Sequence, residues 1–354
     1  MARVRLIQHR EDIAPEHHAV FEELAALRGR ISGPSTVMLH SPGLARPWND
    51  ISEFLHGESI VEPRFAELAV AASARENDCG FVWNSHAGQA RKAGVDETTL
   101  AAVRDRLPLD GLPEGDATVV RFVRQLLQRN RVGAPVFEAL LRSHDERWLV
   151  ELTAWVGRYS ALAWVLNAFE VEPAAGAELL PDLPFAAPGA VDAPAPVFDA
   201  IAAAPGGVRG PFSLLLYSPD LCRRVLEVDT YLQSKSLLTA SERELTVLAT
   251  AQEKDCVYLR TVHLDAARKA GLPEATLAVV DAGADPAGLD PVVRDILLYV
   301  RQILRSHRVE QGLFDALTVA HGTTWLVELT ALIGHYTLLA SLLNAFDVGA
   351  PVVE

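Results

Sequence analysis

The sequence predicts an all-α protein built from two tandem copies of one domain. Residues 67–94 recur at 244–271, a shift of 177 positions, with 14 of 28 residues identical and no gap. The same shift lays 148–169 on 325–346, with 15 of 22 residues identical. Apolar residues recur at intervals of three and four, as they do in amphipathic helices, and no Asn-Gly or Asp-Gly turn separates strand-like runs.

The two copies are expected at residues 1–174 and 178–354. The boundary falls in 172–181, which is rich in Pro, Ala and Gly, as linkers between compact units are. A second Pro- and Ala-rich stretch, 186–196, aligns with the N-terminal arm of copy one and is therefore assigned to copy two. We expect six to eight helices in each copy, with Gly94 and Gly271 each ending one helix.

Composition excludes several classes of protein. A formal net charge of -14 argues against binding to nucleic acid or to an anionic membrane surface. Three cysteines cannot form a disulfide framework and fit a reducing compartment, and residues 1–10 carry charges where a signal peptide has its apolar run. The most apolar stretch, 326–346, is interrupted by Glu328, His335 and Asn344. We therefore expect a cytoplasmic protein with no membrane span.

A Glu, a Cys and a His recur at the same spacing in both copies. The Cys follows the Glu by twelve residues and the His follows the Cys by seven; the members are Glu67, Cys79 and His86 in copy one, and Glu244, Cys256 and His263 in copy two. An Asp precedes each Cys (Asp78, Asp255) and is expected to cap a new helix. On a helix, seven residues place Cys and His about 20° apart on one face. The turn at Asp78 would then bring the Glu back against the His.

These three residue types suit proton transfer. A thiolate is favoured at a helix N-terminus, an imidazole moves protons near neutral pH, and a neighbouring carboxylate orients it or carries a second proton. Each also has a structural interpretation, because a lone Cys is often a small buried hydrophobe, a helical His is often structural and a helical Glu is often solvated. Recurrence in both copies could follow from duplication alone.

The pattern resembles the carboxymuconolactone decarboxylase and alkylhydroperoxidase D superfamily, over nearly the whole of both copies. This resemblance implies two alkylhydroperoxidase D-like helical domains forming a pseudo-twofold pair, no organic cofactor, and a homo-oligomer in which three chains close a six-domain ring. In the peroxidase branch the motif is Glu, then Cys-x-x-Cys-x-x-x-His, but Val82 and Leu259 occupy the position of the second Cys. Thiol–disulfide cycling within the motif is therefore not available. In the decarboxylase branch that position is commonly Glu, in a Tyr-Glu-Trp-x-x-His run that copy one partly keeps as Phe81, Val82, Trp83 and His86.

Further polar and aromatic residues are candidates for substrate binding. They are His40, Trp83 and Arg158 in copy one, and Tyr217, Arg260 and His335 in copy two. An Arg beside a His would anchor the carboxylate of a small acid; packing of the Trp and solvation of Arg260 are the structural alternatives. Cys and His are too sparse for a structural zinc site, and no phosphate-binding or HExxH motif is found, so no metal is expected.

The sequence thus favours a cofactor-free acid–base enzyme, a lyase or isomerase of the carboxymuconolactone decarboxylase type, acting on a small organic acid or lactone. Two alternatives stay open. One is a thiol peroxidase that uses one Cys per copy and an external thiol. The other is a non-catalytic binding or scaffold protein in which duplication kept the fold and lost the chemistry. Copy one is favoured as the working copy, because it has Trp83 and His40 where copy two has other residues.

Overall fold

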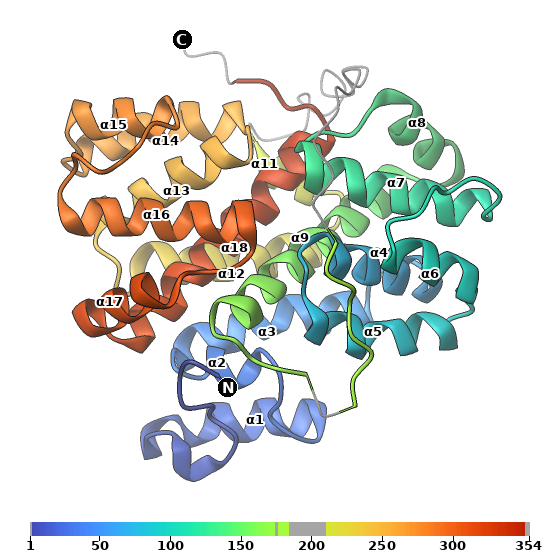
Figure 1. The fold of residues 1–354 in the computed structure, drawn as a ribbon, viewed down its shortest axis with the longest axis horizontal. Coiled ribbons are helices and arrows are strands. Elements are labelled where there is room, and N and C mark those ends of the chain that lie inside the picture. Colours follow the sequence, from blue (N-terminus) through green and yellow to red (C-terminus); the bar gives the residue numbers. More distant parts are fainter. Residues whose placement is uncertain (1, 174–175, 184–209, 351–354) are drawn as a thin grey trace. The chain divides into compact units, whose positions relative to one another are not determined.

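A computed structural model describes residues 2–173, 176–183 and 210–350 (Figure 1). Every element in these ranges is a helix, which confirms the all-α prediction. The Pro- and Ala-rich stretch 186–196, assigned above to copy two, lies outside the described residues. Copy one contains helices α1 to α9 and the described part of copy two contains α11 to α18. Copy one thus exceeds the expected six to eight helices, since it includes the four-residue helix α2, Ser35–Met38.

The chain forms two compact units, and each unit combines residues of both copies. The first consists of Met1–Phe54, Trp164–Glu172 and Arg223–Thr337, and the second of Leu55–Ala163, Pro173–Cys222 and Leu338–Glu354. Four helices contribute residues to both units: α3 (Pro42–Gly57), α9 (Glu146–Ala168), α12 (Pro219–Ser234) and α18 (Thr323–Ala345). The sequence repeat and the compact unit are therefore different sets of residues.

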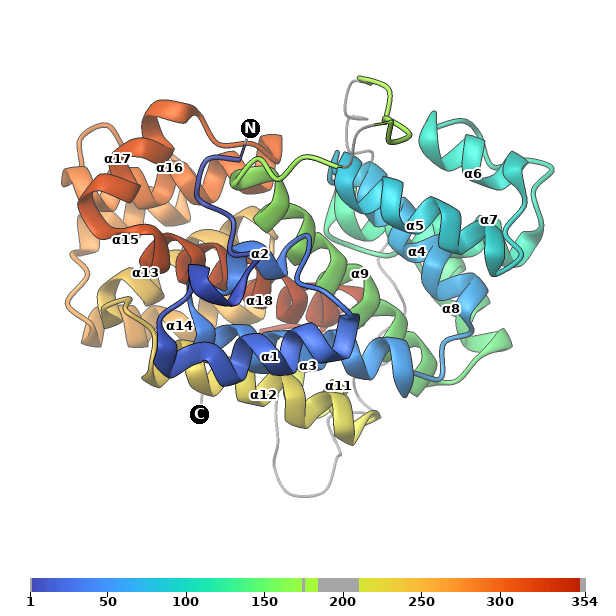
Figure 2. The same cartoon turned by 90° about the horizontal axis from the view of Figure 1, so that it is seen from below.

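In the second unit, α4 is the central helix. It packs on α5, α6 and α7, and α7 packs on α8, as both views show (Figures 1 and 2). Apart from parts of the four helices named above, this unit holds α4 (Pro63–Glu76), α5 (Gly80–Lys92), α6 (Glu97–Arg104), α7 (Glu114–Arg129), α8 (Ala134–Ser143) and α11 (Pro211–Leu215). Ten of the last eleven residues of α4, from Ala66 to Glu76, are buried, because helices cover it on several sides.

In the first unit, α13 takes the same central place. It packs on α14, α15 and α16, and α16 packs on α17. The helices wholly within this unit are α1 (His18–Arg28), α2, α13 (Ala240–Glu253), α14 (Val257–Lys269), α15 (Glu274–Asp281), α16 (Pro291–Ser306) and α17 (Gln311–His321), with two short 3-10 helices, Arg10–Asp12 and Pro15–His17, before α1. The equivalence of α4 and α13 in these packing patterns agrees with the duplication found in the sequence.

A buried glutamate in each long helix holds the N-terminal arm of the other copy. In the second unit, the Glu151 carboxylate accepts a hydrogen bond from the Ser218 hydroxyl, at 2.7 Å. In the first, Glu328 accepts one from the Ser41 hydroxyl, also at 2.7 Å. Glu151 and Glu328 are 0% and 1% exposed. In each unit, a serine that precedes a proline (Ser41 or Ser218) thus bonds the segment contributed by one copy, here called the exchanged arm, to the long helix of the other copy.

Helix α18 is long and apolar enough to cross a membrane by length and composition alone, despite its three polar interruptions. Its apolar window is completely buried within the protein, however, which is what the core helix of a soluble protein shows. One such helix is weak evidence for a membrane span.

Lys254 is an unusual component of the first unit. It ends α13 and is only 6% exposed, with its ammonium 6.0 Å from the centre of the Trp164 ring. Burial lowers the pKa of Lys254 from 10.5 to about 8, against the opposing effect of Glu253. Copy one has Asn77 at the equivalent position.

Replacing Lys254 with Met is expected to stabilise the protein near neutral pH. Because the lysine pKa is lower in the folded chain than in the unfolded chain, the unfolded state binds more protons between the two values. The free energy of unfolding of the unsubstituted protein should therefore rise with pH from about 8 to 10.5. In Lys254→Met this rise should disappear, with a gain at pH 7 on the order of 3 kcal/mol. Urea unfolding at pH 7 and pH 10 measures both effects, and an unchanged pH dependence would contradict the assignment.

Candidate active site

The junction of α4 and α5 places Cys79 and His86, and it differs from the expected geometry. Asp78 is not the helix cap: it has a left-handed backbone, with φ 49°, and Cys79 itself is the N-cap of α5. The amide of Cys79 donates to the carbonyl of Ala74 and that of Asp78 donates to Arg75, which is the Schellman pattern that ends a helix. Asp takes the left-handed position usually held by Gly, because its short polar side chain tolerates that conformation.

Copy two repeats this junction. Asp255 has φ 48°, Cys256 is the N-cap of α14, and the amide of Cys256 donates to the carbonyl of Ala251. Gly94 and Gly271 follow the next helices with φ 90° and 88°, which confirms them as helix-ending residues. The hairpins α4–α5 and α13–α14 are thus built by the same backbone turns.

Each hairpin brings its Glu and His into direct contact. The Nδ1 atom of His86 lies 2.8 Å from Oε2 of Glu67, and Nδ1 of His263 lies 2.8 Å from Oε2 of Glu244. The predicted return of the Glu against the His is therefore confirmed in both copies. In each pair the carboxylate accepts a hydrogen bond from the Nδ1–H group of the neutral imidazole. The Nε2 atom of that ring then carries the lone pair that can take up a proton. The His86 and His263 side chains are 16% and 15% exposed, so each pair is largely buried but still reaches solvent.

Both motif cysteines are buried beside these hairpins. Cys79 is 0% and Cys256 1% exposed, and neither forms a disulfide. The third cysteine, Cys222, is partly exposed, and burial raises the pKa of its thiol. A buried thiol is poorly placed to meet both a peroxide and an external reductant, and Val82 and Leu259, at the position of a resolving Cys, are buried as well.

A tyrosine from the long helix covers each histidine. In copy one the rings of Tyr159 and His86 meet edge to face with centres 4.7 Å apart, and in copy two Tyr336 and His263 do so at 5.2 Å. The sequence analysis did not single out these tyrosines. The available signal was their identity at the same position of the repeated 148–169 and 325–346 segments.

The two copies differ in the residue that contacts the hydroxyl of this tyrosine. The Tyr159 hydroxyl is 2.6 Å from Nε2 of His56, whose ring centre is 6.3 Å from that of His86. In copy two Gln233 replaces His56 and donates to the Tyr336 hydroxyl at 2.7 Å. Both side chains can hold the tyrosine, but only the imidazole can also accept and release a proton. In copy one the tyrosine hydroxyl therefore contacts an imidazole, whereas in copy two it contacts an amide, and the second imidazole near Tyr336, that of His335, contacts Asp229 instead.

Two of the candidate substrate-binding residues, His40 and Tyr217, belong to a different unit from their copy's Glu–His pair. His40 belongs to the first unit, whereas the Glu67–His86 pair belongs to the second; the His40 ring contacts the Arg5 carbonyl at 2.8 Å, and burial lowers its pKa. Tyr217 belongs to the second unit, whereas the Glu244–His263 pair belongs to the first. The structure thus places neither residue in the unit that holds its own copy's Glu–His pair.

The remaining candidates belong to the same unit as their copy's Glu–His pair and differ in their surroundings. His335 is 2% exposed, contacts Asp229 at 3.2 Å and lies against the Tyr336 ring, with centres 5.5 Å apart. Arg158 is 3% exposed and precedes Tyr159 in α9. Trp83 is completely buried, and its equivalent, Arg260, forms an ion pair with Asp281. Among the described residues, no group of three or more His, Cys, Asp or Glu is arranged to hold a metal ion.

The fold and the site define a class: duplicated all-helical proteins with one Glu–His pair in each hairpin. Comparison with known families then identifies the chain. The model described as the carboxymuconolactone decarboxylase family matches it twice, at residues 42–118 and 219–302, and both Glu–Cys–His sets lie inside these ranges. Each copy therefore contains one region that matches the carboxymuconolactone decarboxylase family. No curated protein matches it.

Proposed function

We propose that this protein is a cytoplasmic, cofactor-free acid–base enzyme, a lyase or isomerase that acts on a small organic acid or lactone. The observation that carries the proposal is the 2.8 Å contact between His86 and Glu67. Glu67 accepts a hydrogen bond from the Nδ1–H group of His86. His86 therefore removes a proton from the substrate through Nε2. The carboxylate then stabilises the imidazolium that forms.

A second group is needed to return the proton at another substrate atom. In copy one the pair formed by His56 and Tyr159 supports this role, because its imidazole lies 6.3 Å from that of His86 and is exposed to solvent. Proton transfer from His56, directly or through the Tyr159 hydroxyl, would complete an isomerisation or protonate the carbanion left by decarboxylation. Copy two has Gln233 in place of His56, so we propose that copy one is the working site.

Proton exchange into candidate substrates tests this proposal. Carboxymuconolactone and a panel of small unsaturated lactones and keto acids are incubated with the protein in D₂O and followed by NMR. Loss of the signal of the acidic proton, or release of CO₂, at a rate proportional to protein concentration is the expected result. Absence of both from every member of the panel would contradict the acid–base proposal and favour the non-catalytic alternative.

We expect no thiol peroxidase activity. Each hairpin has one cysteine, and both are buried, so peroxide reduction would stop once the thiol had been oxidised. Cumene hydroperoxide consumption in the presence of dithiothreitol should therefore equal that of buffer and should not change in Cys79→Ser. Peroxide consumption that is lost in Cys79→Ser and kept in Cys222→Ser would overturn this expectation and establish the peroxidase alternative.

A further inference from the structure

Trp155, a buried residue of α9, packs against the imidazole of His56 within the second unit. The two rings meet edge to face, with centres 4.8 Å apart and planes at 85°. Trp155 is 2% exposed, whereas His56 is exposed in the last turn of α3. An exposed side chain at a helix end normally samples several rotamers, because few neighbours restrict it. The indole supplies such a neighbour and therefore limits the orientations open to the imidazole.

The Trp155 ring is itself fixed by contacts that do not involve His56. It stacks on the Tyr159 ring, with centres 5.7 Å apart and planes at 12°. Its Nε1–H group donates to the Ser59 hydroxyl at 3.3 Å, and that hydroxyl also accepts from the Val61 amide at 3.2 Å. Trp155 and Tyr159 are one helical turn apart, so both rings project from the same face of α9. The indole is therefore a fixed surface against which the imidazole rests.

The orientation of the His56 ring decides which groups it can serve. Its Nε2 atom lies 2.6 Å from the Tyr159 hydroxyl, and the two rings meet edge to face with centres 6.1 Å apart. The His86 ring lies 6.3 Å away, with its plane at 24° to that of His56. Another rotamer of His56 would break the contact with Tyr159. Because a proton moves only between groups within hydrogen-bond reach, the transfer depends on this one orientation.

Copy two lacks the indole and the imidazole together. Leu332 takes the place of Trp155, and Gln233 takes the place of His56. The tyrosine itself is kept, as Tyr336, and is still buried. Since the tyrosine packs in the fold without an indole at the equivalent position, the indole of copy one serves the imidazole.

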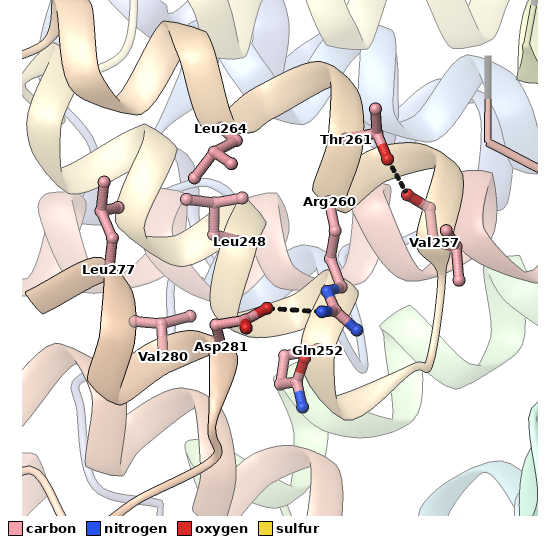
Figure 3. Close-up of a pocket in the computed structure, with 9 residues that line it drawn as sticks. All are labelled: Leu248, Gln252, Val257, Arg260, Thr261, Leu264, Leu277, Val280 and Asp281. Carbon is pink, nitrogen blue, oxygen red and sulfur yellow. Dashed lines mark hydrogen bonds and ion pairs between the residues drawn. The ribbon is translucent and has the colours of Figure 1, made fainter. Parts of the chain in front are cut away.

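Arg260, a basic residue of copy two, does not replace this imidazole. It lines a cavity of about 240 Å³ between α13, α14 and α15, where its guanidinium pairs with Asp281 (Figure 3). Among the described residues that line this cavity, neither Glu244 nor His263 is present. A guanidinium also does not release a proton near neutral pH. The difference between the copies therefore lies at the positions of the imidazole and the indole.

We propose that Trp155 is a positioning residue: its indole holds His56 in the orientation in which Nε2 meets the Tyr159 hydroxyl. It acts through His56 and not on the substrate. The inference rests on the proposed function, in which His56 returns the proton to the substrate.

The effect on the reaction is measured in a double-mutant cycle of Trp155→Leu and His56→Gln, each of which introduces the residue of copy two. Product formation from the substrate identified in the panel should fall about tenfold in Trp155→Leu and about a hundredfold in His56→Gln. In a chain that already carries His56→Gln, Trp155→Leu should cause no further loss, because it acts only through the imidazole. Trp155→Phe keeps an aromatic ring and should stay within about twofold of the unsubstituted rate. Equal losses from Trp155→Leu with and without His56→Gln would overturn the inference, because a purely structural residue behaves in that way.

The orientation of His56 is measured without any substrate. Proton–nitrogen NMR of the full chain with labelled histidine should show the His56 ring in a single tautomer, because the Tyr159 hydroxyl contacts its Nε2 atom. In Trp155→Leu these signals should move to those of a mixture of both tautomers, and in Trp155→Phe they should not. Unchanged His56 signals in a folded Trp155→Leu would contradict the role given to the indole.

Trp148→Leu is the matched control, because it makes the same substitution earlier in the same helix. Trp148 is also buried, at 3% exposed, and its Nε1–H group donates to Glu62 at 2.7 Å. It should leave the His56 signals unchanged; a shift as large as that of Trp155→Leu would overturn the specific role of Trp155. Thermal unfolding shows whether each variant is folded, and Trp155→Met, with its flexible side chain, replaces Trp155→Leu if that variant does not fold.

The two measurements separate this inference from the proposed function. Unchanged His56 signals overturn the inference, while turnover by the unsubstituted protein still supports the acid–base proposal. Absence of turnover across the panel contradicts the acid–base proposal, while loss of the single tautomer in Trp155→Leu still supports the holding of His56 by Trp155.

Discussion

His86→Ala is expected to lower the rate of proton exchange by at least about a hundredfold, because it removes the general base together with its contact to Glu67. Glu67→Gln should cost less, on the order of tenfold. The Gln side-chain oxygen still accepts the Nδ1 proton and keeps the tautomer, but it no longer stabilises the imidazolium by charge. Initial rates by NMR in D₂O, with the substrate identified from the panel, measure both effects.

The control for this series is Cys79→Ser, in which a hydroxyl replaces the buried thiol. If the cysteine has only a hydrogen-bonding role at the hairpin, part of the activity should remain. Equal and complete loss in Cys79→Ser and His86→Ala would contradict the acid–base assignment, because it would make the thiol as necessary as the imidazole.

Glu328→Ala is expected to produce the largest loss of stability. The buried carboxylate accepts hydrogen bonds from the Leu237 amide at 2.6 Å, the Ser41 hydroxyl at 2.7 Å and the Tyr231 hydroxyl at 3.0 Å. Removing it takes away the acceptor of all three donors, and of these only the Ser41 and Tyr231 hydroxyls, 3.2 Å apart, can still bond to each other. The free energy of unfolding should fall by about 3 kcal/mol, because three hydrogen bonds to a charged acceptor are lost together.

Two further variants separate this network from a simple loss of volume. Glu328→Gln keeps the shape and one acceptor oxygen, so it should cost clearly less than Glu328→Ala in urea unfolding. Ser41→Ala removes only the contact with the exchanged arm and should cost about 1 kcal/mol. A change within experimental error for Glu328→Ala would contradict the role given to this carboxylate.

Local spacing was enough to predict the Glu–His pairs. Both residues of a pair lie in one helical hairpin, 19 residues apart, so the helical repeat and one turn determine their contact. The backbone at Asp78 was predicted wrongly. An Asp before a helix usually caps it, but here the Schellman bonds that end α4 place Asp78 in the left-handed region and leave the cap position to Cys79.

Contacts between distant segments could not be predicted from spacing. Tyr159 and His56 come from different helices and are 103 residues apart, and Ser41 and Glu328 are 287 residues apart. Nothing in the local pattern indicated that the arm of one copy would bond to the long helix of the other. The interpretation of His40 and Tyr217 as neighbours of their own copy's histidine assumed compact copies, whereas each compact unit mixes both.

The central claim is that copy one performs the chemistry, and comparing His86→Ala with His263→Ala tests it most directly. Both variants remove an imidazole from a Glu–His contact of 2.8 Å, so their effects on folding should be closely matched. The account predicts that deuterium exchange into the substrate is lost in His86→Ala and stays within about twofold of the unsubstituted rate in His263→Ala. Loss of exchange in His263→Ala with activity retained in His86→Ala would contradict it.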